Sequence, residues 1–211
     1  MTELILALDL TSGDEAVDLA TRCTPYLDAL KVGYPLVLRA GLDISNRLSG
    51  TGLPLIADFK VADIPETNRS IAGAVFSAGY SGIICHGFTG ADAIRACTET
   101  AHDHGGECYV VAEMSHPGAL EFFHEGTGER IARTAVGCGA DGIIAPATRP
   151  ERIRVYREIV GRRKILSPGI GAQGGSLQET AGLADGIIVG RSIYAAPDPV
   201  GAAKQYSVVR R

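Results

Sequence analysis

Three charged residues cluster within residues 54–68. Asp58 and Lys60 lie at the end of an apolar run that begins at Pro54, and Asp63 follows them. Residues two apart on a strand point to the same side, so Asp58 and Lys60 should share one face. Because buried charges are costly unless paired, this trio favours a chemical site. The alternative is a structural Asp58–Lys60 ion pair, with Asp63 as N-cap of a helix that has Pro65 in its first turn.

Similar charges accompany two earlier apolar runs. Asp9 follows the run 4–8, and Lys31 interrupts the run 29–33. If the ends of these strands meet, Asp9, Lys31, Asp58 and Lys60 bring together two acids and two bases. Lys31, Asp58, Lys60 and Asp63 would then form an alternating chain of charge, which holds each ammonium charged and fixes its direction. A plain salt-bridge network is the alternative.

Two glycine-bearing segments suggest a phosphate site near the end of the chain. Pro168-Gly169-Ile170-Gly171 follows the run 164–167, and Gly190-Arg191 follows the run 185–189. Backbone N–H groups of glycine-rich turns and short helix starts commonly bind phosphate after the seventh and eighth strands of a barrel. The guanidinium of Arg191 would add a matching charged fork. The alternative is that these glycines only form turns.

Other polar residues support weaker predictions. Ser115 either binds a polar ligand edge or opens a loop, and the sequence fixes no role for Glu113. We expect His86 to be a hydrogen-bonded residue of the barrel and not a catalyst. The remaining histidines show no metal-ligand spacing with cysteine or carboxylate: His102, His104, His116 and His124.

Apolar runs alternate with helix-like segments along the whole chain. Residues 81–84, 140–144 and 184–188 repeat one pattern, in which a glycine leads into a pair of isoleucines. This alternation predicts an α/β fold, a (β/α)8 TIM barrel forming one catalytic domain over residues 1–211. An open doubly wound sheet is the alternative, but no G-x-G-x-x-G follows the first strand. The expected strands are 4–8, 29–33, 54–60, 82–85, 108–113, 141–145, 164–167 and 185–189, and the expected helices are 13–22, 36–48, 64–77, 90–104, 128–137, 150–161, 176–182 and 198–206.

Composition narrows the class of protein. The 211 residues are 45% hydrophobic and 21% charged with a net charge of −4, which is ordinary for a globular protein and argues against nucleic-acid binding. The five cysteines include no C-x-x-C pair, so we expect buried free thiols at Cys85, Cys108 and Cys138 and a reducing cytoplasm. The N-terminal stretch lacks a basic region, so we expect neither a signal peptide nor a membrane span.

The run from Asp58 to Thr67 resembles the signature of the orotidine 5′-phosphate decarboxylases, and the compact length resembles their archaeal branch. Related barrels, the 3-keto-gulonate-phosphate decarboxylases and hexulose-phosphate synthases, share D-x-K-x-x-D but use Mg²⁺ and carry a metal-binding acid at the end of the second strand. Lys31 stands at that position here, which favours the metal-free decarboxylase. Further matches occur in family order: Leu8-Asp9, Leu30-Lys31-Val32-Gly33, His86-Gly87-Phe88, Met114-Ser115-His116-Pro117-Gly118, Pro168-Gly169-Ile170-Gly171 with Gln173, and Val189-Gly190-Arg191.

The resemblance implies decarboxylation of orotidine 5′-phosphate to uridine 5′-phosphate, the last step of pyrimidine nucleotide biosynthesis, without cofactor or metal. It implies a cytoplasmic homodimer with sites at the subunit interface, to which the partner contributes Asp63 and Thr67. Lys60, Asp58, Asp63 and Lys31 would be catalytic, and Asp9 and Lys31 would contact the ribose. Ser115 would bind the pyrimidine edge, while Gln173, Gly190 and Arg191 would hold the phosphate under a loop that starts at Pro168. Further substrate contacts are expected from Ile64, Thr67, Gly169 and Gly171.

Three alternatives remain open. The nearest is a Mg²⁺-dependent sugar-phosphate decarboxylase or aldolase on the same barrel. The second is a Schiff-base aldolase that uses Lys60 or Lys31. The third is a barrel that binds a phosphate ligand and turns nothing over.

Overall fold

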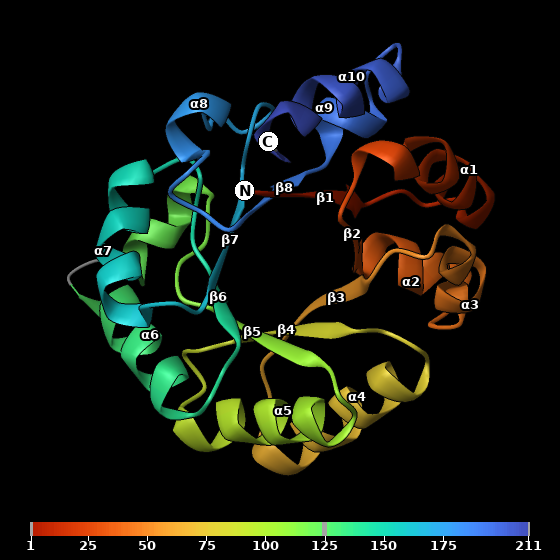
Figure 1. Ribbon diagram of the computed structural model, residues 1–211. Coiled ribbons are helices and arrows are strands. Elements are labelled where there is room, and N and C mark those ends of the chain that lie inside the picture. Colours follow the sequence, from red (N-terminus) through yellow and green to blue (C-terminus); the bar gives the residue numbers. More distant parts are fainter. Residues whose placement is uncertain (1, 124–125, 211) are drawn as a thin grey trace.

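Eight parallel strands close into a barrel, which confirms the predicted (β/α)8 fold. The computed structural model describes residues 2–123 and 126–210, so His124 lies outside the described residues. Each strand pairs with the next along the chain, and β8 pairs with β1, which excludes the open doubly wound sheet (Figure 1). The strands are β1 Glu3–Leu8, β2 Ala29–Gly33, β3 Leu55–Val61, β4 Gly82–His86, β5 Glu107–Val111, β6 Gly142–Ile144, β7 Lys164–Pro168 and β8 Gly186–Val189.

Helices surround this barrel (Figure 1). The α-helices are α1 Gly13–Cys23, α2 Tyr34–Ala40, α3 Ile44–Leu48, α4 Pro65–Ser77, α5 Ala91–Asp103, α6 Thr127–Gly137, α7 Pro150–Val160, α8 Leu177–Thr180, α9 Arg191–Tyr194 and α10 Pro199–Tyr206, and 3-10 turns span Thr24–Tyr26, Ser49–Thr51, Pro117–Glu121 and Ser207–Arg210. The prediction of one helix over 36–48 is wrong, because Gly41 takes a φ of 82° and ends α2. The helix expected over 176–182 shrinks to α8, and α9 was not predicted.

The hydrophobic core has two layers. Apolar side chains of the strands alternate between the barrel interior and the surrounding helices, as the period of a strand requires. The inner layer fills the barrel with Ile5, Ala7, Ala29, Ile56, Ile84, Tyr109, Val111, Ile144, Leu166 and Ile188. The outer layer is larger and joins the strands to the helices. The charged strand ends therefore stand on a filled barrel, so the space for a ligand lies at its carboxyl mouth.

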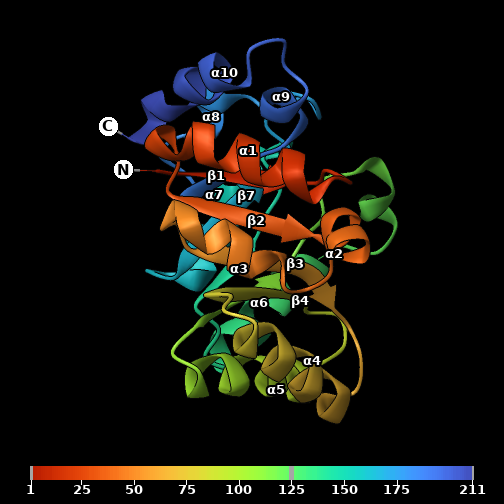
Figure 2. The same ribbon diagram turned by 90° about the vertical axis from the view of Figure 1, so that its right-hand side faces the viewer.

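The two ends of the described chain meet at the opposite mouth. The Thr2 N–H donates to the Val209 carbonyl at 3.2 Å. In Figure 2 the N and C labels lie on the side from which β2 starts, and the β2 arrow points away from them. The carboxyl mouth is thus well separated from both ends.

All five cysteines are free. Cys85 and Cys108 are buried, as predicted, whereas Cys138 is only half-buried. Among helices in the described ranges, none has both the length and the apolar character needed to cross a membrane. A cytoplasmic location stays a prediction.

Candidate active site

A cavity of about 310 Å³ opens at the carboxyl mouth of the barrel. The structure brings most of the predicted site residues to its wall, from six different strand ends or the loops that follow them. Those residues are Asp9, Lys31, Asp58, Lys60, Ser115, Pro168, Gly169, Gln173, Gly190 and Arg191. Residues far apart in the sequence therefore share one concave surface, the usual place for chemistry in this fold.

Four charges on β1–β3 and their ends form a continuous chain, which we call the charge array: Asp9, Lys31, Asp58 and Lys60. The Lys31 Nζ lies 2.7 Å from Asp58 Oδ2 and 3.4 Å from Asp9 Oδ1. The Lys60 Nζ lies 2.7 Å from the other oxygen, Asp58 Oδ1. Asp58 thus joins two ammonium groups. The Lys31 side chain is buried, whereas 36% of the Lys60 side chain is exposed.

The charge array keeps its buried members ionised. Burial alone would lower the pKa of Lys31, but the Asp58 and Asp9 carboxylates outweigh it and raise that pKa above its ordinary value. Burial would likewise raise the pKa of Asp58, but Lys31 and Lys60 hold that pKa below its ordinary value. At neutral pH Asp58 is therefore an anion between two cations.

Lys60 is placed by a distorted backbone. Its φ of 44° lies in the left-handed region, and it is the one non-glycine residue with positive φ within residues 2–123 and 126–210. The β3–β4 ladder shifts register between Ala57 and Val61, around this position. Such a conformation costs on the order of 1–3 kcal/mol and persists only where the surrounding structure enforces it. The backbone strain thus lies at the residue whose ammonium faces the cavity.

Phe59 supplies part of that enforcement. Its side chain points away from the cavity, and its ring stacks on Tyr34 with centroids 5.1 Å apart. The Tyr80 ring meets Phe59 edge-on at 6.3 Å. The aromatic contacts hold the backbone on both sides of Phe59, so Asp58 and Lys60 both reach the cavity.

Gly33 makes room for Asp9. A Cβ atom at position 33 would lie 2.6 Å from Asp9 Oδ1, which is shorter than any relaxed contact, and 3.7 Å from Lys31 Nζ. The glycine at the end of β2 therefore lets the first carboxylate of the charge array approach the second strand.

The segment after β3 corrects one prediction. Helix α4 begins at Pro65, so its N-cap is Ile64 and not Asp63. The reason is that Pro65 restricts the residue before it to extended backbone, which fixes the boundary at Ile64. The Asp63 carboxylate instead accepts a hydrogen bond from the Ile64 N–H at 2.7 Å, and the Asp63 N–H donates to Asn68 Oδ1 at 3.0 Å.

Four predicted site residues lie outside the cavity of this single chain. Asp63 is exposed, Ile64 is 66% exposed and Thr67 is half-buried on α4. Gly171, with a φ of 70°, is exposed and does not line the cavity, and an added Cβ there would clash with the Ser192 and Tyr206 side chains. Since Asp63 and Thr67 are expected to serve a partner's site, their position here agrees with that expectation without testing it.

The cavity end formed after β7 and β8 combines a tightly packed glycine turn with an available cation. Gly169, at a φ of 105°, is packed so tightly that an added Cβ would lie 3.2 Å from Thr148 Cγ2 and 3.3 Å from Gln173 Oε1. Arg191 is the first residue of α9 and is exposed. Across the described ranges its guanidinium forms no ion pair. This geometry suits an anion.

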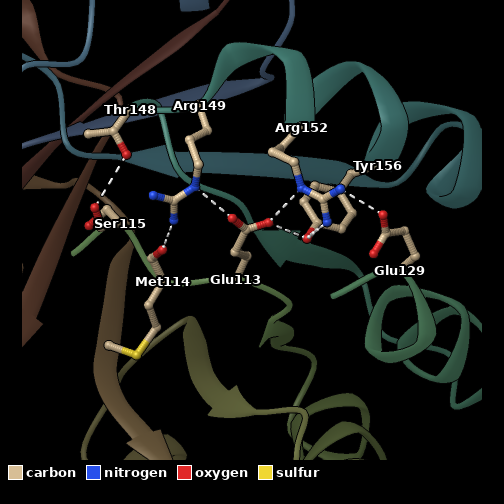
Figure 3. A network of polar contacts seen from close by, with 8 residues as sticks. All are labelled: Glu113, Met114, Ser115, Glu129, Thr148, Arg149, Arg152 and Tyr156. Carbon is tan, nitrogen blue, oxygen red and sulfur yellow. Dashed lines mark hydrogen bonds and ion pairs between the residues drawn. The ribbon is translucent and has the colours of Figure 1, made fainter. Parts of the chain in front are cut away.

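Sequence reasoning missed a second charged group at the mouth, shown in Figure 3. Glu113 follows β5 and meets Arg149 and Arg152 from the start of α7. The sequence does not predict a role for Arg149, because an Arg before Pro150 is typical of an exposed helix start. The only available signal was Glu113 itself, an acid directly after an apolar strand.

His86 also differs from expectation. Its Nδ1 is buried and has no hydrogen-bond partner among the described residues, although we expected one. Its ring packs against Phe88 at 4.8 Å and Phe123 at 6.5 Å between centroids. Burial, followed by the charge of Lys60, lowers the pKa of His86 to about 4, so the ring is neutral at pH 7.

Sequence relatives agree with this site. Curated proteins named orotidine 5′-phosphate decarboxylase include one from Methanococcoides burtonii, 53% identical over 205 residues, covering 96% of this chain and 94% of that protein. Another, from Pyrococcus horikoshii, is 48% identical over 205 residues and covers 95% of each chain.

Solved structures agree as well. Orotidine 5′-monophosphate decarboxylase from Methanocaldococcus jannaschii, complexed with the inhibitor BMP, superimposes with a TM-score of 0.95 at 39% identity, covering 99% of this chain and 98% of that one. The Pyrococcus horikoshii OT3 enzyme gives a TM-score of 0.89 at 46% identity, covering 98% of both chains. The model of the orotidine 5′-phosphate decarboxylase / HUMPS family matches residues 2–206, and this chain belongs to that family.

Proposed function

We propose that this protein decarboxylates orotidine 5′-phosphate to uridine 5′-phosphate and CO2, the last step of de novo pyrimidine nucleotide synthesis, without a cofactor. The family and the names of its relatives support the reaction. The observation that carries the mechanism is the Lys60 ammonium, which lies 2.7 Å from Asp58 and faces the cavity on a strained backbone.

Lys60 answers the central difficulty of this reaction. When the C6–carboxylate bond breaks, CO2 leaves and the electron pair stays on C6, where no adjacent group can accept it. A fixed ammonium at that place stabilises the carbanion. The Lys60 Nζ then gives its proton to C6 as general acid, which forms the C6–H bond of the product.

Asp58 would face the substrate carboxylate. Two like charges about 4 Å apart repel by roughly 4 kcal/mol at an effective dielectric near 20, and loss of CO2 relieves that repulsion. Enzymes typically supply roughly 8–23 kcal/mol of acceleration, so one repulsive pair is too little. We therefore assign the larger share to carbanion stabilisation by Lys60.

The rest of the charge array would orient the substrate. Lys31 is held between Asp58 and Asp9, so its direction is fixed before a ligand arrives. Asp9 keeps 37% of its side chain exposed, which leaves it free to accept a hydrogen bond from a ribose hydroxyl.

The opposite end of the cavity would hold the phosphate through Gln173, Gly190 and Arg191. The segment after Pro168 would close over it, and the Ala172 N–H already donates to Ser192 Oγ at 2.9 Å. Phosphate lies far from C6, but its binding energy can drive loop closure and so lower the barrier of the chemical step.

A homodimer would complete the site with Asp63 and Thr67 of the partner. Large apolar side chains stay exposed on segments that follow β2 to β5 at the carboxyl mouth, where a second copy would cover them. They are Tyr34, Leu38, Ile64, Phe88 and Phe122.

The metal-dependent alternative is disfavoured by the donor set. Lys31, a cation 2.7 Å from Asp58, stands at the end of β2 where the related sugar-phosphate enzymes are expected to carry an acid. Within the described ranges, no three His, Cys, Asp or Glu residues are grouped to hold a metal ion. Independence from metal stays a prediction for the experiment below.

The test follows the absorbance of orotidine 5′-phosphate with purified protein in excess chelator. We expect full turnover, and uridine 5′-phosphate as product. Activity that requires added Mg²⁺ would favour the sugar-phosphate alternative, and binding of uridine 5′-phosphate without turnover would favour a non-catalytic barrel. Borohydride trapping with a carbonyl substrate would reveal a Schiff base on Lys60 or Lys31.

A further inference from the structure

Glu113 is a buried acid whose bonding capacity is used within the protein. The residue is 2% exposed. Its Oε1 accepts from Arg149 Nε at 2.7 Å, and its Oε2 accepts from Arg152 Nε at 2.9 Å and from Tyr156 Oη at 2.6 Å (Figure 3). Both carboxylate oxygens are thus occupied, although the residue borders the cavity. Glu113 is therefore suited to hold other groups and not to react.

The near side of this group holds the loop that carries Ser115. Arg149 uses its Nε for Glu113 and its Nη2 for the Met114 carbonyl (Figure 3). The preceding residue, Thr148, donates from Oγ1 to the Ser115 carbonyl at 3.3 Å. Two consecutive carbonyls of the loop are therefore tied to two consecutive residues before α7, which fixes the backbone on both sides of the Ser115 Cα.

The far side anchors the carboxylate to the outer helices. Arg152 also donates from Nη1 to Glu129 Oε1 of α6 at 2.6 Å. Its guanidinium lies 5.0 Å from the centroid of the Tyr156 ring. Two acids face two arginines, so the group, which we call the Glu113 network (Glu113, Glu129, Arg149, Arg152 and Tyr156), needs no outside counter-ion.

Ser115 gives this wall a polar group that is free for a ligand. It lines the cavity, and an added Cβ on Gly169 would lie only 3.4 Å from its Cβ, so the phosphate-end loop packs beside it. Within the described part of the chain the Ser115 hydroxyl has no hydrogen-bond partner. A hydroxyl on a fixed backbone can read a base edge with little loss of entropy on binding.

We propose that Glu113 is a positioning residue, which acts through Arg149 and the Met114–Ser115 backbone to set the Ser115 hydroxyl for the pyrimidine base. It therefore governs affinity for the base and leaves affinity for the ribose phosphate unchanged. This inference rests on the proposed function, because only that function identifies the base.

The experiment measures two dissociation constants by titration calorimetry, for uridine 5′-phosphate and for ribose 5-phosphate. The Glu113→Gln protein should bind uridine 5′-phosphate about 3- to 10-fold more weakly, the worth of one positioned hydrogen bond, with ribose 5-phosphate nearly unaffected. Ser115→Ala should give a similar loss. In the double variant Glu113→Gln should add nothing, because its effect passes through the missing hydroxyl.

Tyr156→Phe is the matched control. It removes one hydrogen bond from Glu113 Oε2 and leaves the Arg149 arm intact. We expect a lower Tm with an unchanged ratio of the two dissociation constants. If Glu113→Gln does not fold, Arg149→Met replaces it in the cycle, because Glu113 then keeps Arg152 and Tyr156.

Two results would overturn the inference: additive losses from Glu113→Gln and Ser115→Ala, or equal weakening of both ligands. The unmodified protein separates this failure from that of the proposed function. If it neither turns over orotidine 5′-phosphate nor binds uridine 5′-phosphate, the proposed function fails and the inference falls with it. If it does both and the cycle is additive, only the positioning role is lost.

Discussion

Two groups of buried charges share one barrel mouth and differ in how completely they are satisfied. In the charge array Asp58 is bonded on both oxygens, but the chain ends in Lys60 and Asp9, whose side chains are 36% and 37% exposed. In the Glu113 network the central acid has a side chain only 3% exposed and both arginines are shared between several acceptors. One group is open toward the cavity, and the other is closed around Glu113, although at its far end Glu129 Oε2 is buried with no hydrogen-bond partner among the described residues.

We interpret the open charge array as the group that acts on a ligand and the closed Glu113 network as the group that supports the wall of the cavity. An open group has unused donors and acceptors whose direction is already set, as transition-state stabilisation requires. A closed group resists rearrangement, because breaking a buried ion pair leaves an uncompensated charge. Ionic residues at a cavity can therefore be sorted by whether all their hydrogen-bonding groups are used by protein partners or some remain available to a ligand.

The largest expected effect is on the open group. Lys60→Ala should reduce turnover by ~10⁴-fold or more, because in the proposed mechanism one group supplies both proton transfer and charge stabilisation. Its Tm should change little, since the side chain is partly exposed and Asp58 keeps Lys31. Steady-state kinetics and thermal unfolding of the same preparation test this. Near-normal turnover would remove Lys60 from the acid role.

Glu113→Ala should show the reverse of Lys60→Ala, with a large loss of stability and a smaller loss of turnover. It leaves Arg149 and Arg152 without their shared acid, which typically destabilises a fold by about 3–5 kcal/mol. Chemical denaturation would measure the free energy of unfolding, with Tyr156→Phe as the milder comparison. A loss below that of Tyr156→Phe would contradict the description of the Glu113 network as closed.

Arg191→Ala should weaken ligands without regard to the base. A charged hydrogen bond is worth about 1.5–3 kcal/mol, so both uridine 5′-phosphate and ribose 5-phosphate should bind roughly ten- to a hundredfold more weakly. Turnover should fall too if phosphate binding drives closure. Titrations at two salt concentrations check the charge, because the exposed contact should be screened. Unchanged kinetics would exclude Arg191 from the site.

His86, which feels the charges of Lys60 and Asp58, gives a pH test. Its folded pKa of about 4 lies below the ordinary 6.5, so the unfolded chain binds a proton that the folded one refuses. The contribution of neutral His86 to the free energy of unfolding is then fully present above pH 6.5. It is lost as pH drops toward 4, by at most roughly 3 kcal/mol.

In a His86→Gln variant that loss is absent, so the stability advantage of the unmodified protein over the variant should shrink between pH 6.5 and 4. The lowered pKa of Asp58 acts in the same direction, since its contribution is lost as pH falls through the folded pKa, but it is common to both proteins. Parallel curves of unfolding free energy against pH would contradict the buried, neutral state of His86.

The smallest effect concerns the backbone of the open group. Lys60→Gly should be more stable than Lys60→Ala by about 1 kcal/mol, because glycine adopts a positive φ without the Cβ clash. Both variants lack the ammonium, so only the conformational strain differs. Equal Tm values would show that the left-handed conformation relaxes once the side chain is gone.

The sequence predicts the open group better than the closed one. Asp9, Lys31, Asp58 and Lys60 stand at the ends of apolar strands, so the rule that barrel strands share a carboxyl mouth is enough to gather them. The Glu113 network depends on a helix start, Arg149 and Arg152, that meets a strand end only through the tertiary packing of α7. Nothing in the local pattern distinguishes these arginines from surface ones.

The sequence also does not predict the short helix α9, the N-cap of α4 or the backbone conformation of Lys60. The four residues of α9 carry no hydrophobic period, so the helix that begins at Arg191 left no signal. Asp63 fits the pattern of a helix cap, yet Pro65 moves the cap to Ile64. The left-handed φ of Lys60 is invisible in the sequence, because a lysine gives no hint of positive φ.

The shifted ladder between β3 and β4 has a consequence for enzyme design. Grafting the D-x-K-x-x-D letters onto a regular eight-stranded scaffold would deliver the right side chains on the wrong trajectory, because the host strand would keep its even pleat at the lysine. A designer would have to import the irregular main-chain path together with the Phe59 side chain that braces it. For the proposed chemistry, the path of the strand would matter as much as the amine that it carries.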